Sequence, residues 1–159
     1  MGVAGSGKTT IAKLLAKALD CPFLEGDSLH SPANIEKIRH GVPLDDADRL
    51  PWLKAIAAAI DAWQKQGQCG VVTCSALKRR YRDILIENRK GIRLVYLRGS
   101  HALIGARIAA RQGHFAPAAL LESQFAALEE PASGENPLTV DVADEPGKIT
   151  QRILAALKK

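Results

Sequence analysis

The chain has 159 residues, of which 47% are hydrophobic and 25% charged, and this balance is typical of one globular domain rather than of a disordered or fibrous protein. Its wholly apolar stretches are far shorter than the ~20 residues needed to span a bilayer, and its first residues lack the pattern of a secretory signal. The net charge of +5 is scattered among acidic residues and aromatic residues make up 4%, so we expect an anion-binding cleft rather than a nucleic-acid surface.

The predicted elements alternate between helices and strands. Apolar residues from Ile11 to Leu19 recur with helical spacing directly after a glycine-rich loop. Ser31 and Pro32 predict the start of a later helix and Gly41 its end. In chain order, we expect a helix through Leu19, a strand over 21–27, helices over 31–41 and 53–66 (the second capped by Asp45 or Asp46 after a polar turn), a strand over 69–77, a helix over 78–89, a strand over 91–99, helices over 100–112 and 116–128, a strand over 138–142 and a helix over 146–159.

This alternation predicts an α/β fold in which helices cover both faces of a parallel sheet. Such sheets bind ligands beyond the carboxyl ends of their strands. Three predicted strand ends carry polar residues, at Gly26–Asp27, Cys74–Ser75 and Val142–Asp144. We therefore expect these ends to converge beside the opening loop, within a single domain over residues 1–159.

The three cysteines, Cys21, Cys69 and Cys74, are odd in number and lack C-x-x-C spacing. Two of them lie in or beside an apolar run, where small thiols are commonly buried. We expect free thiols in a reducing compartment, and hence a cytoplasmic protein with no membrane or nucleic-acid partner.

The opening loop carries the most familiar motif. Residues 2–9, GVAGSGKT, match the phosphate-binding pattern G-x-x-x-x-G-K-[ST] at every fixed position. The glycines allow successive backbone N–H groups to face phosphates at the positive end of the following helix. Lys8 is expected to reach the β- and γ-phosphates and the Thr9 hydroxyl to bind Mg²⁺. The predicted ATP-binding residues are Gly2, Val3, Ala4, Gly5, Ser6, Gly7, Lys8, Thr9 and Thr10; a plain glycine-rich turn is the alternative.

The loop alone does not separate a small-molecule kinase from a GTPase or a motor ATPase. The apolar strand that would supply a second metal-binding acid ends in Ser75 instead. Asp27 follows the strand after the first helix, where it can orient a substrate hydroxyl, accept its proton or hold a metal-bound water. A turn-capping role is the alternative. Arg107 and Arg111 share one helix face, so they are either lid residues that neutralise the transferring phosphoryl group or two solvated arginines.

Longer motifs resemble the gluconokinase family of P-loop small-molecule kinases. EGDSLHSPANIEKIRHGVPLDDADRLPWL, CSALKRRYRDIL, RQGHF and LLESQFAALEEP follow the phosphate loop in order, and together they span essentially the whole chain. The resemblance implies a three-layer P-loop kinase sandwich with a lid over about 107–130 and a substrate-binding segment over 26–50. It implies ATP-dependent phosphorylation of D-gluconate to 6-phospho-D-gluconate, and it makes a homodimer an expectation.

The resemblance also assigns individual residues. Asp27 would orient the 6-hydroxyl of gluconate or act as its base, with His30 beside it. Because a guanidinium fork suits a carboxylate, Arg49 and Arg82 are favoured over Lys78 as its partners. The implied catalytic residues are Lys8, Asp27, Arg107 and Arg111, and the implied substrate-binding residues are Asp27, His30, Arg49, Lys78, Tyr81, Arg82 and His114.

Two alternatives stay open. The family pattern has an apolar strand before the phosphate loop, so we expect the first strand of the sheet to be missing here, and a nucleotide-binding relative without kinase activity is one alternative. The other is a kinase whose acceptor is shikimate, a nucleoside monophosphate or another sugar acid. Residues 144–147 are the positional expectation for adenine contacts.

Overall fold

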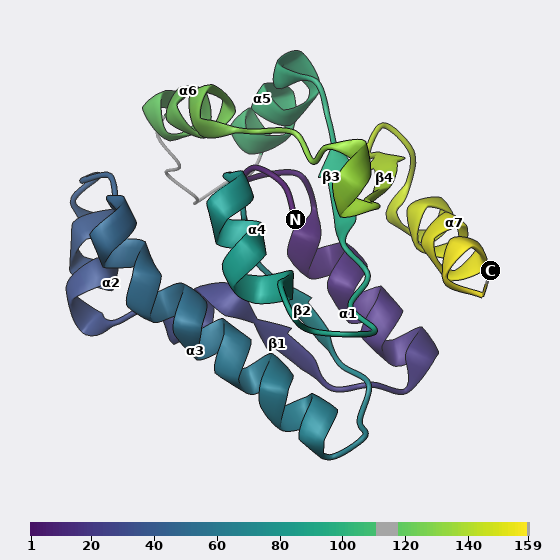
Figure 1. Ribbon diagram of the computed structural model, residues 1–159. Helices are drawn as coiled ribbons and strands as arrows, with labels where there is room; N and C mark the ends of the chain where they lie inside the picture. The colour runs from purple at the N-terminus through teal and green to yellow at the C-terminus, as the bar shows by residue number, and fades with distance from the viewer. Residues whose placement is uncertain (111–117, 159) are drawn as a thin grey trace.

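The computed structural model describes residues 1–110 and 118–158 (Figure 1). Helices and parallel strands alternate along this part of the chain, which confirms the predicted α/β class. The elements are α1 (Lys8–Leu19), β1 (Phe23–Glu25), the 3₁₀ helix η1 (Gly26–Leu29), α2 (Pro32–Arg39), α3 (Asp46–Lys65), β2 (Val71–Thr73), α4 (Arg79–Ile86), β3 (Val95–Arg98), α5 (His101–Ala109), α6 (Ala118–Ala127), the 3₁₀ helix η2 (Ser133–Glu135), β4 (Leu138–Asp141) and α7 (Pro146–Leu157).

Side-chain caps explain where α2 and α3 begin. The Ser31 hydroxyl accepts a hydrogen bond from the backbone N–H of Asn34 at 3.2 Å, as the sequence predicted. Asp45 caps α3 in a reciprocal capping box with Asp48. Helix α3 therefore begins at Asp46, and the stretch predicted as a polar turn before residue 53 forms its first turns.

The strands form two parallel pairs. In one pair β1 lies beside β2 with Phe23 opposite Val71, and in the other β3 lies beside β4 with Val95 opposite Leu138. No ladder joins β2 to β3 in the described part of the chain. The sheet is thus divided at its centre, where a first strand was expected to be missing.

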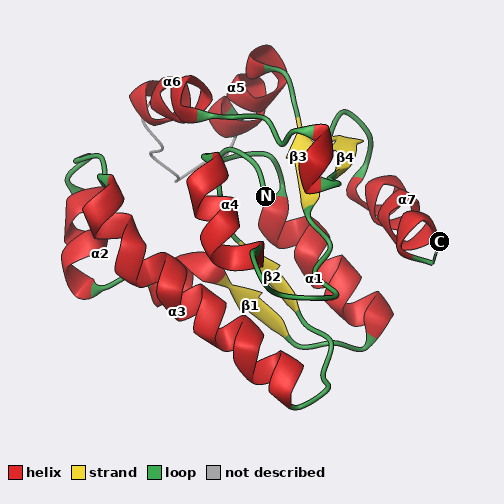
Figure 2. Cartoon of the chain, in the orientation of Figure 1, coloured by secondary structure: helices red, strands yellow, loops and turns green. Residues whose placement is uncertain are grey.

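Met1 and Gly2 lie between the two pairs. The Met1 amine donates to the carbonyl of Val95 at 2.5 Å, and the N–H of Leu97 donates to the carbonyl of Met1 at 3.0 Å. On the other side, the N–H of Gly2 donates to the carbonyl of Ser75 at 3.2 Å. Figure 2 shows the N-terminus between β2 and β3. These two residues take the place of a central strand and deliver the phosphate loop to the strand ends.

An apolar groove of about 370 Å³ runs beside Met1 between the two pairs. Its lining includes Ile11 and Leu15 of α1, Val72 of β2 and Val95 of β3. These side chains also belong to the hydrophobic packing of the two pairs. The groove is therefore a gap in the core, and it offers a polar substrate little to bind.

Helices cover both sides of the strands, and two hydrophobic clusters hold these layers together (Figure 1). One cluster joins α1, α7, β3 and β4, and the other joins α3, β2 and α4. Helices α5 and α6 lie side by side at the end of the molecule near the phosphate loop (Figure 1). This confirms the three-layer sandwich. None of the described helices is long and apolar enough to cross a membrane.

The expectation of three free cysteines is wrong for two of them. Cys21 and Cys69 form a disulfide with their Cα atoms 5.6 Å apart, whereas Cys74 is free and buried. Strands β1 and β2 start side by side, with the N–H of Val71 donating to the carbonyl of Pro22 at 2.9 Å. This pairing brings together two cysteines that are 48 positions apart in sequence.

Candidate active site

The phosphate loop is shaped by its glycines. Gly5 and Gly7 have φ angles of 79° and 89°, in the left-handed region that favours glycine. A Cβ on Gly5 would lie 2.8 Å from Cγ1 of Ile108 in α5, whereas no atom lies within 4 Å of a Cβ placed on Gly7. The loop is therefore packed against α5 on one side and open beside the start of α1.

Lys8 places its charge at the centre of this loop. Its ammonium group donates to the carbonyls of Gly2 and Val3, each at 3.0 Å. Thr9 is exposed in the first turn of α1, and the Ser6 hydroxyl is buried with no hydrogen-bond partner among the described residues. The loop therefore fits a nucleotide phosphate and its Mg²⁺. It offers open space at a helix N-terminus, the Lys8 cation, the exposed Thr9 hydroxyl and the unpaired Ser6 hydroxyl.

The described residues contain no group of three or more His, Cys, Asp or Glu side chains that could hold a metal. A Mg²⁺ ion at this loop would thus depend on the Thr9 hydroxyl and on the phosphates of the nucleotide itself. This is the usual way in which Mg²⁺ is bound in such sites, with few protein ligands.

The end of β1 places Asp27 in the solvent-facing turn η1. Gly26 fits tightly against β2, since a Cβ there would lie 2.1 Å from the carbonyl oxygen of Thr73. The indole N–H of Trp52 donates to the carbonyl of Gly26 at 2.7 Å, and the exposed Asp27 follows directly. Trp52 packs in the core, and it also fixes this turn.

His30 lies beside Asp27 and stacks on Trp52, with the ring centroids 4.2 Å apart. Partial burial lowers the pKa of His30, although the neighbouring carboxylate of Asp27 acts in the opposite direction. The neutral imidazole is thus favoured at neutral pH. Helix α2, which follows this turn, is held against α3, because the Asn34 amide donates to the carbonyl of Asp48 at 2.8 Å.

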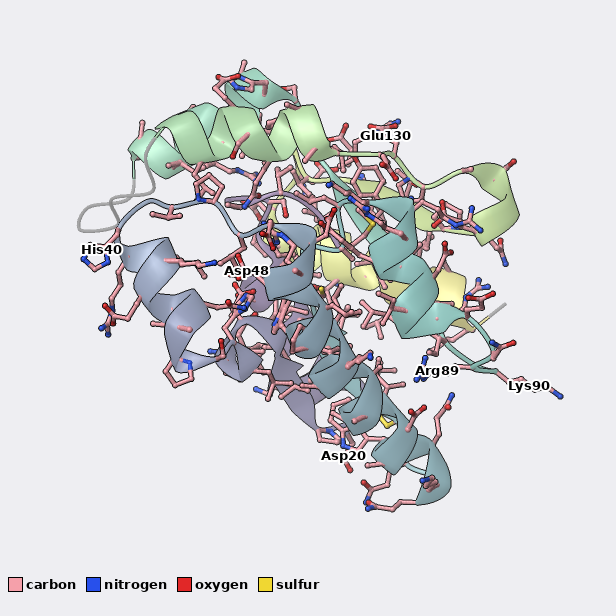
Figure 3. All side chains as sticks on the ribbon, turned by 60° about the vertical axis from the view of Figure 1, so that its left-hand side comes forward. Asp20, His40, Asp48, Arg89, Lys90 and Glu130 are labelled. Atoms are coloured by element: carbon pink, nitrogen blue, oxygen red, sulfur yellow. A yellow bond between two sulfur atoms is a disulfide. The ribbon has the colours of Figure 1, made fainter. Side chains whose placement is uncertain are left out.

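Asp48 ties the substrate-binding segment into one unit. Its carboxylate accepts two hydrogen bonds from Lys37 at 2.6 and 2.7 Å, and Figure 3 shows it between α2 and α3. The Lys37 ammonium holds the pKa of Asp48 below its usual range. This pair sets α2 against the first turn of α3, from which Arg49 extends.

Asp46 gathers three residues of segment 78–82, and its role was not predicted beyond a possible helix cap. Its carboxylate accepts hydrogen bonds from Lys78 at 3.3 Å, from the Tyr81 hydroxyl and from Arg80. The Tyr81 hydrogen bond is the main cause that lowers the pKa of Asp46, followed by the Lys78 bond. Burial, and then Asp46, raise the pKa of Tyr81 to about 12.

Arg49 completes this cluster. Its guanidinium lies 5.9 Å from the centre of the Tyr81 ring, and its Nε donates to the carbonyl of Leu44 at 3.2 Å. Lys78 lies 5.6 Å from the centre of the same ring. The structure thus brings together the predicted cations Arg49 and Lys78 beside Tyr81. The signal for this cluster in the sequence is the run of acidic residues Asp45, Asp46 and Asp48 ahead of a basic helix.

The structure gives Arg82 a structural role in place of the predicted substrate contact. Its side chain is 1% exposed and forms a two-pronged ion pair with Glu135, with Nη2 and Oε1 3.0 Å apart. Its Nη1 donates to the carbonyls of Ala76, Leu77 and Glu129. The guanidinium is thus enclosed and engaged by the protein, so it cannot reach a ligand without breaking these bonds.

The predicted lid residues divide into two groups. Arg107 donates from Nη2 to the carbonyl of Val142 at 2.6 Å, which directs it to the end of β4. Arg111 and His114 lie outside the described residues. Of the predicted strand ends, Ser75 after β2 contacts the phosphate loop through the N–H of Gly2, Gly26 after β1 packs against Thr73 of β2, and Val142 after β4 contacts Arg107 of α5.

The chain matches the protein-family model described as "AAA domain" over residues 1–131. It is 41% identical to the thermosensitive gluconokinase of Escherichia coli K12 over 158 residues, which cover 99% of this chain and 84% of that protein. It is 44% identical to the gluconokinase of Gluconobacter oxydans 621H over 154 residues, 97% of this chain and 86% of that one. The protein belongs to the gluconokinase family.

A solved structure agrees with this assignment. The crystal structure of a gluconokinase from Sinorhizobium meliloti 1021 matches with a TM-score of 0.88 at 44% identity, over 99% of this chain and 89% of that one. The family assignment confirms the P-loop kinase fold and an enzyme of the gluconokinase family. The roles of the individual site residues stay predictions.

Proposed function

We propose that this gluconokinase-family protein transfers the γ-phosphoryl group of ATP to the 6-hydroxyl of D-gluconate. The proposal is supported by two dissimilar groups of residues near the strand ends. One is the phosphate loop with Lys8 at its centre, and the other is Asp27 with the cations Arg49 and Lys78; Lys8 and Asp27 both lie near enough to Cys74, just after β2, to act on it electrostatically. A triphosphate suits the first, and a polyhydroxylated carboxylate suits the second.

The proposed mechanism depends on positioning and charge. Backbone N–H groups at the start of α1 hold the phosphates of ATP, and Lys8 stabilises the charge on the transferring oxygens. The Thr9 hydroxyl and the phosphates of ATP would hold Mg²⁺, which would supply further neutralisation of charge. Asp27 accepts the proton of the 6-hydroxyl or orients it for in-line attack, and its exposed carboxylate is accessible for this. Arg107 is a further candidate for charge stabilisation, once it leaves the Val142 carbonyl.

Arg49 and Lys78 are proposed to hold the gluconate carboxylate and hydroxyl groups. Asp46 orders Lys78 and Tyr81, so the cations face the acceptor in a defined arrangement. His30, neutral and stacked on Trp52, offers a ring nitrogen to a substrate hydroxyl. Stacking surfaces that a nucleoside would use are scarce here, because Trp52 is buried.

An ADP-release assay with a panel of acceptors tests the proposal. D-gluconate, shikimate, AMP and related aldonates are compared at equal concentration, and the product is identified by ³¹P NMR. We expect gluconate to give the highest kcat/KM and a 6-phosphate ester. A higher kcat/KM for shikimate or AMP would favour the other kinase hypothesis, and ATP binding with no turnover on any acceptor would favour a nucleotide-binding relative.

The remaining proposals concern assembly and compartment. A homodimer, which the family resemblance implies, would be tested by light scattering on the purified protein. A cytoplasmic site suits an ATP-dependent enzyme, although disulfides such as Cys21–Cys69 are uncommon there. Titration of free thiols in protein kept from air tests the compartment: the disulfide leaves one thiol, Cys74, whereas three thiols would indicate a reducing compartment.

A further inference from the structure

The end of α6 and the segment that follows it contact both halves of the site. On α6, the Gln124 side-chain oxygen accepts a hydrogen bond from the backbone N–H of Ala4 at 2.6 Å. Ala4 lies inside the phosphate loop, directly before Gly5, whose left-handed backbone conformation favours glycine. A residue 120 positions away in sequence thus fixes one of the loop's backbone donors.

The same segment then anchors itself to the acceptor side. The backbone N–H of Glu129 donates to the carbonyl of Leu77 at 2.9 Å, and the Glu129 carboxylate accepts from the backbone N–H of Arg79 at 2.6 Å. Arg79 opens α4, whose N-cap residue Lys78 makes no side-chain cap of its own. Glu129 therefore supplies the cap and the negative charge that this helix start favours.

Two further contacts hold the segment in place. The Tyr96 hydroxyl at β3 donates to Glu130 at 3.0 Å, and Figure 3 shows Glu130 on the stretch that leaves α6. Glu135 forms the buried ion pair with Arg82. Residues 124–135, here called the brace, thus have one attachment at the phosphate loop and several at α4 and β3.

We propose that the brace holds the phosphate loop in register with acceptor segment 77–82, and that Gln124 is the positioning residue that contacts the loop. The inference rests on the proposed function only for the KM and kcat measurements, which need gluconate as the acceptor. Binding of a nucleotide can be measured without an acceptor. Ala4 is only half-buried, so water can replace Gln124 at its N–H without great cost in stability. The cost falls on nucleotide binding, since a looser loop must be ordered when the phosphates bind.

The test compares Gln124→Met, which keeps the length of the side chain but removes the acceptor, with Gln124→Glu, which keeps an acceptor oxygen. Ser123→Ala is the matched control, because the Ser123 hydroxyl donates only within α6, to the carbonyl of Leu120. Calorimetric titration with a non-hydrolysable ATP analogue gives Kd, steady-state kinetics give KM and kcat, and thermal melts give stability.

We expect Gln124→Met to weaken analogue binding and raise KM for ATP about five- to tenfold, the scale of one hydrogen bond. The KM for gluconate and the melting temperature should change little, and Gln124→Glu should bind the analogue more tightly than Gln124→Met. An unchanged Kd in Gln124→Met, or a loss that only follows reduced thermal stability, would overturn the inference. A wild-type protein that binds the analogue but does not phosphorylate gluconate would overturn the proposed function alone.

A second variant tests the brace away from the loop. Glu129→Ala removes the cap on α4 and touches no residue of the phosphate loop. If the brace couples the position of acceptor segment 77–82 to that of the phosphate loop, this variant also raises KM for ATP. Circular dichroism is used to show that the variant is folded. A Glu129→Ala variant that is folded and keeps the wild-type KM for ATP would show that Gln124 acts without the brace.

Discussion

The two halves of the site are built in different ways. The phosphate loop is mostly backbone, formed by residues 2–9, which run from after Met1 into the first turn of α1, and its chemistry depends on glycine φ angles and on one lysine. The acceptor side is made of side chains from η1, α3 and the start of α4, which are held together by carboxylates. Contiguous backbone sites can be predicted from a motif, whereas a side-chain cluster depends on which partners each charge finds in the fold.

The largest expected effect concerns the loop. Lys8→Ala should lower kcat at least ~10²-fold, the scale of losing one preorganised charge-stabilising contact. Lys17→Ala is the control, because Lys17 is exposed near the end of the same helix. Steady-state ADP release measures both variants, and near-wild-type turnover in Lys8→Ala would remove the loop from the catalytic machinery.

Arg82 tests whether a cation near the acceptor side stabilises the fold or binds the substrate. Arg82→Met should destabilise the protein by about 3–5 kcal/mol, because it leaves Glu135 without its buried partner. The control Arg80→Met removes an exposed pair with Asp46 and should cost at most about 1 kcal/mol. Urea unfolding measures both. If Arg82→Met keeps full stability and loses only gluconate affinity, Arg82 contacts the substrate after all.

Asp46 tests whether the acceptor cluster is held in position by a carboxylate. Asp46→Asn keeps the size of the side chain but weakens the charge-assisted bonds to Lys78 and Tyr81, so KM for gluconate should rise about three- to tenfold. KM for ATP should stay the same. Asp61→Asn, which loosens the remote pair with Arg89, is the control. Equal changes in both KM values would mean that Asp46 supports the fold as a whole.

The smallest effect is a pH dependence at His30. The pKa of His30 is lower in the folded state than its usual value of about 6.5, so its contribution to stability is present above that pH and is lost as the pH falls through the folded pKa. His30→Phe keeps a ring on Trp52 but cannot be protonated. Between pH 7.5 and 5.5, the wild-type urea midpoint should therefore fall more than that of the variant. Parallel pH profiles would mean that His30 protonation does not oppose folding.

Much of the fold was predictable because its signals are local. Ser31 caps α2 and the glycine-rich loop opens α1, as their sequences indicated. One error is a helix boundary: Asp45 caps α3 as expected, but the helix begins at Asp46 rather than near residue 53. The other arises where distant residues meet, because the pairing of β1 with β2 joins Cys21 to Cys69. That pairing leaves no periodic or contiguous pattern in the sequence.

In the candidate site too, local sequence signals were predictable and contacts between distant residues were not. Asp27, Arg49 and Lys78 come from segments that a family resemblance could identify, and they lie around one turn and one tyrosine ring. Arg82 has the right chemistry for a carboxylate substrate, but its carboxylate partner is Glu135 of the chain itself. The contacts of Gln124 with Ala4 and of Asp46 with Tyr81 were not predicted, because these partners lie 120 and 35 residues apart in the sequence.

Asp27 provides the most direct test of the central claim, that a nucleotide loop and an acceptor cluster act on one phosphoryl group. The measurement is gluconate-dependent ADP release by Asp27→Asn, with binding of the ATP analogue determined on the same sample. The account predicts unchanged analogue binding and turnover reduced at least ~10²-fold, since a positioned general base contributes on that scale. Full turnover in Asp27→Asn would contradict it and leave Asp27 as a residue of the turn alone.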